Sequence, residues 1–227
     1  MSKLSIIVPV FNEEKTIRLV LEKLLSLSLD KEIIVIDDGS ADSTGKIIDA
    51  FIPAIRVMKH KINSGKGMAL RTGIALATGD YIIFCDADLE YDINQIPYLY
   101  KYLLENKLTV LYGSRFIDYR PKKNFIHYLG NKILTLTTDW FFGAKLTDME
   151  TGYKLFRSDI LKNLNLSSSH FEIEPEITAK ILKQGIPIVE LPISYDPRVK
   201  SEGKKIKYRD GLIALKTLIK EKLKRRG

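Results

Sequence analysis

The chain has 227 residues, of which 45% are hydrophobic and 28% are charged, a composition typical of a soluble globular α/β protein. The formal net charge of +8 sits at the C-terminus: residues 198–227 hold 12 Lys or Arg against 3 Asp or Glu, a local +9, whereas residues 1–197 hold 24 against 25. This local excess indicates an anionic partner at that end, and the scarcity of interleaved aromatic residues argues against nucleic-acid binding.

In the first half, short apolar runs alternate with amphipathic stretches of helical length. Strands are expected at residues 4–10, 32–38, 55–60, 81–86 and 109–114. Asn12 is expected to cap a helix that runs to about Leu27, and Asp92 to cap another that runs through Leu104. This alternation predicts a Rossmann-like, mostly parallel central sheet with helices on both faces.

The second half is less regular. A helix is expected at 124–142, a turn at Gly152 before a short strand, a helix near 174–184 and a strand at 186–193. A polar, basic segment at 195–207 is predicted to be a mobile loop, and a final helix is expected from 210 to 225. We predict a single domain over residues 1–227.

Polar residues gather where the predicted strands end. They form the stretches "PVFNEE", "DDGSADST", "NSGKG", "DADLE" and "GSR". Because ligands of such sheets bind beyond the carboxyl ends of the strands, we expect these five stretches to line one site.

Asp86 and Asp88 are separated by one residue at the end of an apolar run, so both can reach one point. Carboxylate oxygens suit Mg²⁺ or Mn²⁺, and a departing diphosphate needs such a Lewis acid. Glu90 is a candidate third ligand, either directly or through water. Taken alone, a D-x-D motif is more often a solvated acidic turn.

Other strand ends suggest contacts to a nucleotide. Asp37 and Asp38 end the second strand and suit hydrogen bonds to a base or ribose, although Asp38 or Ser40 could instead cap the next helix. Lys66, in "NSGKG", is expected at a Gly-rich helix start that lines the nucleotide side, because the stretch is not a Walker motif.

Arg115, Arg198 and Lys204 are cations that could bind phosphate oxygens and, with a carboxylate-bound metal, form a diphosphate clamp. His60, His127 and His170 are far apart in sequence and show no metal-ligand spacing, so we expect structural or solvent-facing roles. No Ser-His-Asp or Cys-His arrangement indicates covalent catalysis.

Taken in order, these stretches resemble the family 2 glycosyltransferases, and among them the synthases of dolichyl- and other polyprenyl-phosphate sugars. The resemblance runs from residue 5 to residue 206 and rests on an ordered set of motifs: "SIIVPVFNEEKTI", "EIIVIDDGSADST", "NSGKGMAL", "GDYIIFCDADLE", "GSRF", "LTDMETGYKLF", "FEIEPEI" and "VELPISYDPRVKSEGKKI". It implies a GT-A fold and a nucleotide-sugar donor, a GDP- or UDP-hexose.

The resemblance also implies roles for individual residues. By this resemblance, Pro9, Phe11 and Glu13 would contact the nucleotide, and Ile36 and Asp38 would hold its base or ribose. Asp86, Ala87 and Asp88 would bind the metal-diphosphate, and Arg115, Arg198 and Lys204 would bind phosphates. Two positions depart from the family pattern: Phe11 stands where the family often has tyrosine, and Glu90 where it often has glutamine.

The implied reaction is a metal-assisted single displacement at the anomeric carbon, with inversion and release of a nucleoside diphosphate. A polyprenyl phosphate acceptor is already anionic and needs no strong base. A soluble or saccharide hydroxyl acceptor needs one, and Asp148 or Glu150 is then the best candidate. Asp148 could equally be a turn or cap residue before Gly152.

Within the domain, residues 1–115 are expected to bind the nucleotide sugar and residues 116–209 the acceptor. The helix over 210–227 places Leu212, Leu215, Ile219 and Leu223 near one face, with Lys216, Lys220 and Lys224 as a basic stripe. Such a helix could lie on anionic lipid or pack on the core with a solvated lysine face.

Cys85 is the only cysteine, so no internal disulfide is possible, which fits a reducing compartment. No apolar run reaches transmembrane length, and the N-terminal stretch lacks the features of a signal peptide. The expected location is the cytoplasm, with peripheral contact to the inner membrane face as an alternative.

Two other readings are weaker. A sugar-phosphate nucleotidyltransferase would have a Gly-rich, basic loop after the first strand, where this chain has the acidic "PVFNEEKT". A non-catalytic nucleotide-sugar-binding module would have little reason to keep the carboxylates and phosphate-binding cations together.

Overall fold

The computed structural model describes residues 2–118, 125–197 and 208–224. Its elements are β1 (Leu4–Val10), α1 (Ile17–Ser26), β2 (Lys31–Asp37), α2 (Thr44–Asp49), β3 (Arg56–Lys59), α3 (Lys66–Leu76), β4 (Tyr81–Phe84), η1 (Ile93–Gln95), α4 (Ile96–Glu105), β5 (Val110–Ser114), α5 (Phe125–Phe142), β6 (Lys154–Arg157), α6 (Ser158–Lys162), α7 (Ile173–Lys183), β7 (Val189–Pro192) and α8 (Tyr208–Leu223).

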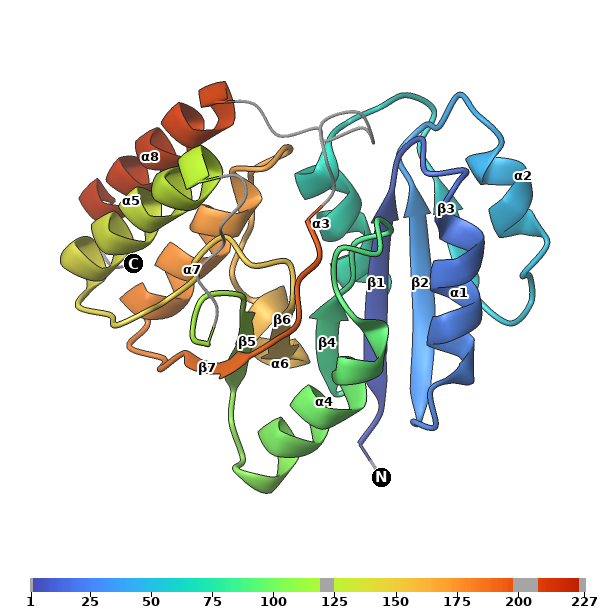
Figure 1. The fold of residues 1–227 in the computed structure, drawn as a ribbon, viewed down its shortest axis with the longest axis horizontal. Helices are drawn as coiled ribbons and strands as arrows, with labels where there is room; N and C mark the ends of the chain where they lie inside the picture. Colours follow the sequence, from blue (N-terminus) through green and yellow to red (C-terminus); the bar gives the residue numbers. More distant parts are fainter. Residues whose placement is uncertain (1, 119–124, 198–207, 225–227) are drawn as a thin grey trace.

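The seven strands form one sheet in the order β3-β2-β1-β4-β6-β5-β7 (Figure 1). All neighbouring strands are parallel except β6, which is antiparallel to both β4 and β5. The predicted mostly parallel sheet is therefore confirmed, and the parallel strands bring the ends of β1, β2 and β4 to one edge.

The residues of β1 alternate between the two faces of this sheet. Ile6 and Val8 belong to the core beneath α1 and α4, whereas Ile7 belongs to the core beneath α3 and α7. Both faces are thus covered by helices, which explains why the central strands are almost continuously apolar. A smaller cluster, containing Met149 and Leu218, joins α7 to α5 and α8, and these two helices lie on the outer side of α7 in Figure 1.

The predicted N-cap of the first helix is wrong. α1 begins at Ile17 after Thr16, and Asn12 has a positive φ of 51° in the preceding turn. The Asn12 side chain accepts a hydrogen bond from the Ala41 backbone N–H at 2.8 Å, and its own N–H donates to Ser40 Oγ at 2.9 Å. Asn12 therefore joins the loops after β1 and β2.

The other predicted cap is confirmed. Asp92 Oδ1 accepts from the Asn94 N–H at 3.0 Å and begins η1, which leads directly into α4. At α2, by contrast, the cap position is Ser43, and Asp42 Oδ1 accepts from the Thr44 N–H. Asp38 and Ser40 do not cap this helix.

We expect the close packing of α3 on β1 to make Gly73 intolerant of a side chain. A Cβ there would lie 2.4 Å from Ile7 Cγ2, whereas a Cβ at Gly130 in α5 would meet nothing within 4 Å. Gly73→Ala should lower the free energy of unfolding by about 1–3 kcal/mol through overpacking. Gly130→Ala should raise it by about 0.5–1 kcal/mol through helix propensity. Urea unfolding measures both, and equal effects would contradict this packing.

Candidate active site

The acidic turn after β4 is anchored by a lysine. Lys66, the first residue of α3, places its Nζ 2.8 Å from Asp86 Oδ1 and 3.1 Å from Glu174 Oε1. The glycine before it makes this position possible, because a Cβ at Gly65 would lie 2.4 Å from the Ser169 carbonyl oxygen. The predicted Gly-rich helix start is therefore confirmed, with its lysine directed at the acidic turn.

Lys66 belongs to a larger network of buried charges. Glu174, near the start of α7, also pairs with Lys154 of β6, whose side chain is fully buried. Burial alone would lower the pKa of Lys66, but the ion pairs with Asp86 and Glu174 outweigh it and hold that pKa above its ordinary value. Burial likewise opposes ionisation of Glu174, yet the two lysines hold the pKa of its carboxyl below the ordinary value.

Asp86 and Asp88 are the two carboxylates predicted to hold a divalent cation. Among the residues that the structure describes, no three His, Cys, Asp or Glu side chains converge as a metal site. Mg²⁺ and Mn²⁺ sites that include substrate phosphates need only one or two carboxylates. Both oxygens of Asp86 contact Lys66 Nζ, at 2.8 and 3.0 Å. A Cβ at Gly152 would lie 2.7 Å from Oδ2, so the missing side chain is what leaves this oxygen a further open side. The residues present therefore fit such an ion.

Glu90 faces another partner. Its Oε2 accepts a hydrogen bond from the Tyr195 hydroxyl at 3.0 Å, and its backbone N–H donates to Asp88 Oδ1 at 3.1 Å. Leu89, between the two acids, has a positive φ of 61°, so the turn holds a backbone conformation that a leucine rarely adopts. Glu90 thus shapes the turn and holds Tyr195, and the structure does not bring it together with Asp86 and Asp88 as a preformed three-carboxylate set.

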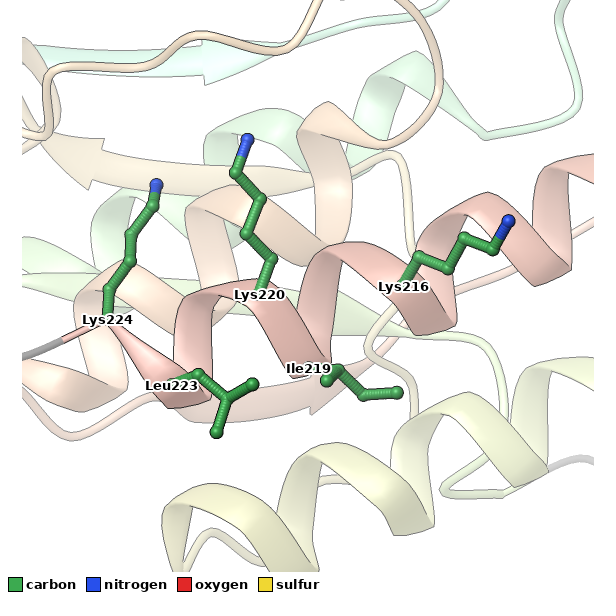
Figure 2. Close-up of a pocket in the computed structure, with 5 residues that line it drawn as sticks. All are labelled: Lys216, Ile219, Lys220, Leu223 and Lys224. Atoms are coloured by element: carbon green, nitrogen blue, oxygen red, sulfur yellow. The ribbon is translucent and has the colours of Figure 1, made fainter.

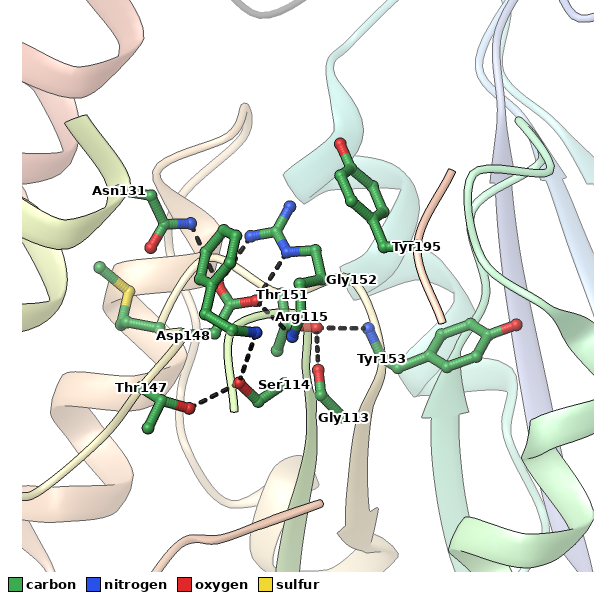
Figure 3. Close-up of polar contacts among 12 residues, drawn as sticks. Gly113, Ser114, Arg115, Asn131, Thr147, Asp148, Thr151, Gly152, Tyr153 and Tyr195 are labelled. Carbon is green, nitrogen blue, oxygen red and sulfur yellow. Dashed lines mark hydrogen bonds and ion pairs between the residues drawn. The ribbon is translucent and has the colours of Figure 1, made fainter. Parts of the chain in front are cut away.

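Arg115 and Asp148 form a buried two-point ion pair (Figure 3). Arg115 Nε lies 2.6 Å from Asp148 Oδ2, and Nη2 lies 2.7 Å from Oδ1. Asn131 of α5 donates to the same Oδ1 at 3.0 Å, and the Asp148 side chain is fully buried. These contacts occupy both oxygens of Asp148. The geometry therefore favours a role in orienting Arg115 over the predicted role as a base.

Tyrosine rings connect Arg115 with the acidic turn. The Arg115 guanidinium lies 5.1 Å from the centroid of the Tyr195 ring, and Tyr195 is the residue that donates to Glu90. Tyr91 pairs with Tyr195 through an isolated β-bridge and stacks on Tyr153 at 4.8 Å. Tyr195 thus contacts both the Arg115 guanidinium, through its ring, and the Glu90 carboxylate of the acidic turn, through its hydroxyl.

Glu150 is a buried carboxyl without a bonded partner at one oxygen. No group in the described part of the chain hydrogen-bonds to its Oε1. Burial raises the pKa of Glu150 to about 7; Glu174 and Asp148 add to this rise, and Lys154 and Arg115 oppose it. A carboxyl that titrates near neutral pH can take up and release protons under physiological conditions.

The predicted base and ribose contacts are not supported by the geometry. Asp38 is 3% exposed, and its carboxylate accepts from the Ser64 and Gly65 N–H groups at 3.0 and 2.7 Å and contacts His60 at 2.7 Å. It therefore fixes the loop that leads into α3. The Ile36 side chain is fully buried in the core, so only its backbone could face a ligand.

Of the remaining predicted site residues, some are described by the structure and others lie outside the described ranges. Pro9 is a half-buried residue within β1, next to the buried Val10, and Phe11 and Glu13 follow in a half-buried turn. Glu13 is tied to the second loop, because its N–H donates to Thr44 Oγ1 at 2.8 Å, and the Ala87 carbonyl accepts from Thr16 Oγ1 at 2.7 Å. Arg198 and Lys204 lie outside the described residues, as does the His127 side chain.

Sequence reasoning missed three residues that organise this site: Glu174, Lys154 and Asn131. Lys154 carried a signal, because it is a charged residue within the apolar run "GYKLF", and such a charge is buried only when it is paired. Glu174 carried no clear signal, because it stands beside two other glutamates in "FEIEPEI". Asn131 carried none, since an amide on an amphipathic helix is ordinary.

The chain is similar to known proteins in three comparisons. The family model described as glycosyl transferase family 2 matches residues 5–164. The chain is 27% identical over 211 residues to the undecaprenyl-phosphate mannosyltransferase of Micrococcus luteus, covering 87% of this chain and 85% of that protein. It is 29% identical over 215 residues to the dolichyl-phosphate beta-glucosyltransferase of Dictyostelium discoideum, covering 85% and 66%.

A solved structure shows the same fold. The glucosyl-3-phosphoglycerate synthase of Mycobacterium tuberculosis, in complex with Mn²⁺, UDP-glucose and phosphoglyceric acid, matches with a TM-score of 0.75. The match covers 97% of this chain and 80% of that one, at 22% identity.

We expect the Arg115–Asp148 pair to support stability far more than an exposed pair of the same geometry. Asp148→Asn leaves a buried guanidinium without its counter-charge and should cost about 3 kcal/mol. The matched control is Asp159→Asn, because Asp159 pairs with Arg157 at 2.6 and 2.8 Å but both side chains are about half exposed. That change should cost less than about 1 kcal/mol. Similar losses in urea unfolding would refute the assignment.

We expect Glu150 to make stability depend on pH. Its folded-state pKa of about 7 exceeds the ordinary 4.5, so between these values the folded protein holds a proton that the unfolded chain has lost. The free energy of unfolding should therefore fall as pH rises from 4.5 to 7, by roughly 2–3 kcal/mol.

The test compares Glu150→Gln with the wild type in unfolding curves between pH 5 and pH 8. The variant should lack this decrease and be the more stable of the two at pH 8. Glu105→Gln, at an exposed carboxylate of α4, should leave the pH dependence unchanged. Parallel curves for Glu150→Gln and the wild type would show that Glu150 does not titrate in this window.

Proposed function

The chain belongs to glycosyl transferase family 2, and from that premise we propose that it moves a hexose from a GDP- or UDP-sugar to a polyprenyl phosphate, with inversion at the anomeric carbon. We assign donor binding to residues 1–115 and acceptor binding to residues 116–209. We propose that the transfer takes place in the cytoplasm, at the inner face of the membrane.

The observation that carries this proposal is the position of Tyr195 between the acidic turn and Arg115. Its hydroxyl holds Glu90, which follows Asp88 in the acidic turn, and its ring lies against the Arg115 guanidinium. This supports placing the carboxylates for a metal-diphosphate and the cation for phosphate oxygens in one site. This pairing suits a reaction in which one phosphate group leaves and another attacks.

Each site residue has a separate role in the proposed reaction. Asp86 and Asp88 would hold Mg²⁺ or Mn²⁺, which would supply Lewis-acid stabilisation of the departing diphosphate. The Mn²⁺ in the neighbouring synthase structure supports this choice. Lys66 contacts both oxygens of Asp86 and holds this carboxylate in place, and Asp148 fixes the Arg115 fork for the acceptor phosphate. Arg198 and Lys204, outside the described residues, are proposed as further phosphate contacts.

The acceptor assignment rests on the charge of a phosphate and on two relatives. A phosphate monoester is anionic at neutral pH and can attack without a base, while Arg115 offers it a cation. The names of the Micrococcus and Dictyostelium relatives specify transfer to undecaprenyl and dolichyl phosphate. We propose the same acceptor class here.

Glu150 favours a second candidate, transfer to a hydroxyl acceptor. Its pKa of about 7 and its unpaired buried oxygen are properties expected of a general base. In that case, activity on the hydroxyl acceptor should rise with pH through about 7, and Glu150→Gln should abolish this rise. A polyprenyl phosphate acceptor should show no such dependence on Glu150.

We expect release of nucleoside diphosphate from a panel of GDP- and UDP-hexoses only when Mg²⁺ or Mn²⁺ and a polyprenyl phosphate are present. Asp88→Ala should lower kcat/KM by about 10²- to 10³-fold, because the metal supplies several kcal/mol of charge stabilisation. Asp92→Ala, in the same acidic stretch but at the cap of η1, is the matched control and should retain activity.

Two results would sink the proposal. If no donor binds or turns over with either metal, the chain lacks the proposed activity. If Asp88→Ala and Asp92→Ala lose activity equally, the metal site is misplaced. Turnover on a soluble hydroxyl acceptor, but not on a polyprenyl phosphate, would select the second candidate.

A further inference from the structure

The exposed apolar side chains of this protein are concentrated on two neighbouring helices. Of the fourteen exposed large hydrophobic side chains in the described part of the chain, eight lie on α5 and α8, which have 18 and 16 residues. These eight are Leu129, Ile133, Leu136, Trp140, Leu212, Ile213, Ile219 and Leu223. We call them the α5–α8 face. A bare apolar surface of this kind marks an interaction site.

On α5 the apolar residues form a single stripe. Leu129, Ile133, Leu136 and Trp140 are spaced by four, three and four residues, which places them on one side of a helix. Their exposed fractions run from 49% at Leu129 to 81% at Trp140. The opposite side of α5 is buried: Thr135 is fully buried, Leu134 packs against the small core cluster, and Asn131 bonds Asp148. The stripe therefore faces away from the protein.

On α8 the apolar and basic residues separate to different sides. Ile219 and Leu223 point toward α5, whereas Lys216, Lys220 and Lys224 point away from it (Figure 2). The two rows are adjacent, because all five residues border one cavity. The two helices are held together, because Lys222 donates from Nζ to the Phe141 carbonyl and lies over the Phe142 ring. Ile219 and Leu223 thus lie between α5 and the row of lysines, which forms a basic edge beside them.

We propose that the α5–α8 face lies on an anionic lipid bilayer, with its apolar side chains inserted at the interface and its lysines directed to lipid phosphates. Three observations select lipid over a second copy of the chain. The lysine edge would repel its own copy, Trp140 is a residue type that sits at membrane interfaces, and long lysine side chains can reach the headgroups from an inserted helix.

This inference is independent of the proposed reaction, since it concerns binding to a surface without donor or metal. None of the helices in the described ranges is long and apolar enough to cross a bilayer, so the contact we propose is made by helices lying in the plane of the interface. It differs from attraction of a basic tail alone, because the apolar stripe of α5 takes part.

Trp140 makes a direct test possible, because it is the single tryptophan of the chain and is 81% exposed. The full chain is mixed with vesicles of phosphatidylcholine containing phosphatidylglycerol, or of phosphatidylcholine alone. With the anionic vesicles we expect co-flotation, a blue shift of the Trp140 emission, and quenching by brominated lipid.

Matched variants separate the two components of binding. Ile133→Ser with Leu136→Ser should weaken vesicle binding about tenfold or more through lost apolar burial. Leu19→Ser, at a leucine of α1 that is 45% exposed, should have no effect. Lys216→Glu with Lys220→Glu should weaken binding to anionic vesicles to a similar extent, whereas Lys46→Glu on α2 should not. Circular dichroism checks that each variant is folded.

Three results would overturn the proposal. The wild type could fail to float with anionic vesicles. It could bind while the Trp140 emission stays unshifted and unquenched, which would indicate charge attraction without insertion. Trp140 could also be buried before lipid is added, in a dimer detected by sedimentation velocity, which would assign the face to a second copy.

Discussion

The arrangement of this site depends on one buried network of charges. Lys66 from α3 reaches Asp86 after β4 and Glu174 on α7, and Glu174 also holds the fully buried Lys154 of β6. A buried charge is tolerated only when it is paired, so none of these residues can move without exposing another to an apolar environment. The network therefore couples the helix on one face of the sheet, the acidic turn and the antiparallel strand.

Much of the fold could be predicted because its signals are local. The apolar run at 4–10 coincides with β1, and the Asp92 cap begins η1 as expected. The prediction that Asn12 caps a helix was wrong because its side chain accepts a hydrogen bond from Ala41 in a neighbouring loop. No local pattern reveals such an interaction. Propensity describes what a residue can do within its own turn, and tertiary contacts decide where two loops meet.

The sequence predicted that polar residues at the strand ends form the site. It did not predict which function each acidic side chain has. Asp38, Asp86, Asp148 and Glu150 are all acids near one edge of the sheet, and their surroundings separate them. The carboxylate of Asp38 accepts hydrogen bonds from backbone N–H groups, that of Asp86 from Lys66, and that of Asp148 from Arg115 and Asn131. Glu150 retains an unpaired oxygen. Spacing in sequence cannot supply these differences, because every partner comes from a distant segment.

Helix α5 connects the candidate active site with the exposed apolar surface. On its inner side, Asn131 bonds Asp148 and so helps to fix Arg115; on its outer side lies the apolar stripe that ends at Trp140. A helix with its side chains is about 10 Å across, so the Arg115 fork lies roughly one helix diameter from the outer surface. If that surface rests on lipid, a phosphate at the bilayer interface has only a short distance to cover. A soluble acceptor would need another reason for the apolar stripe, such as contact with a second copy of the chain. The physical argument for a lipid-phosphate acceptor therefore comes from the two sides of one helix, in addition to the names of relatives.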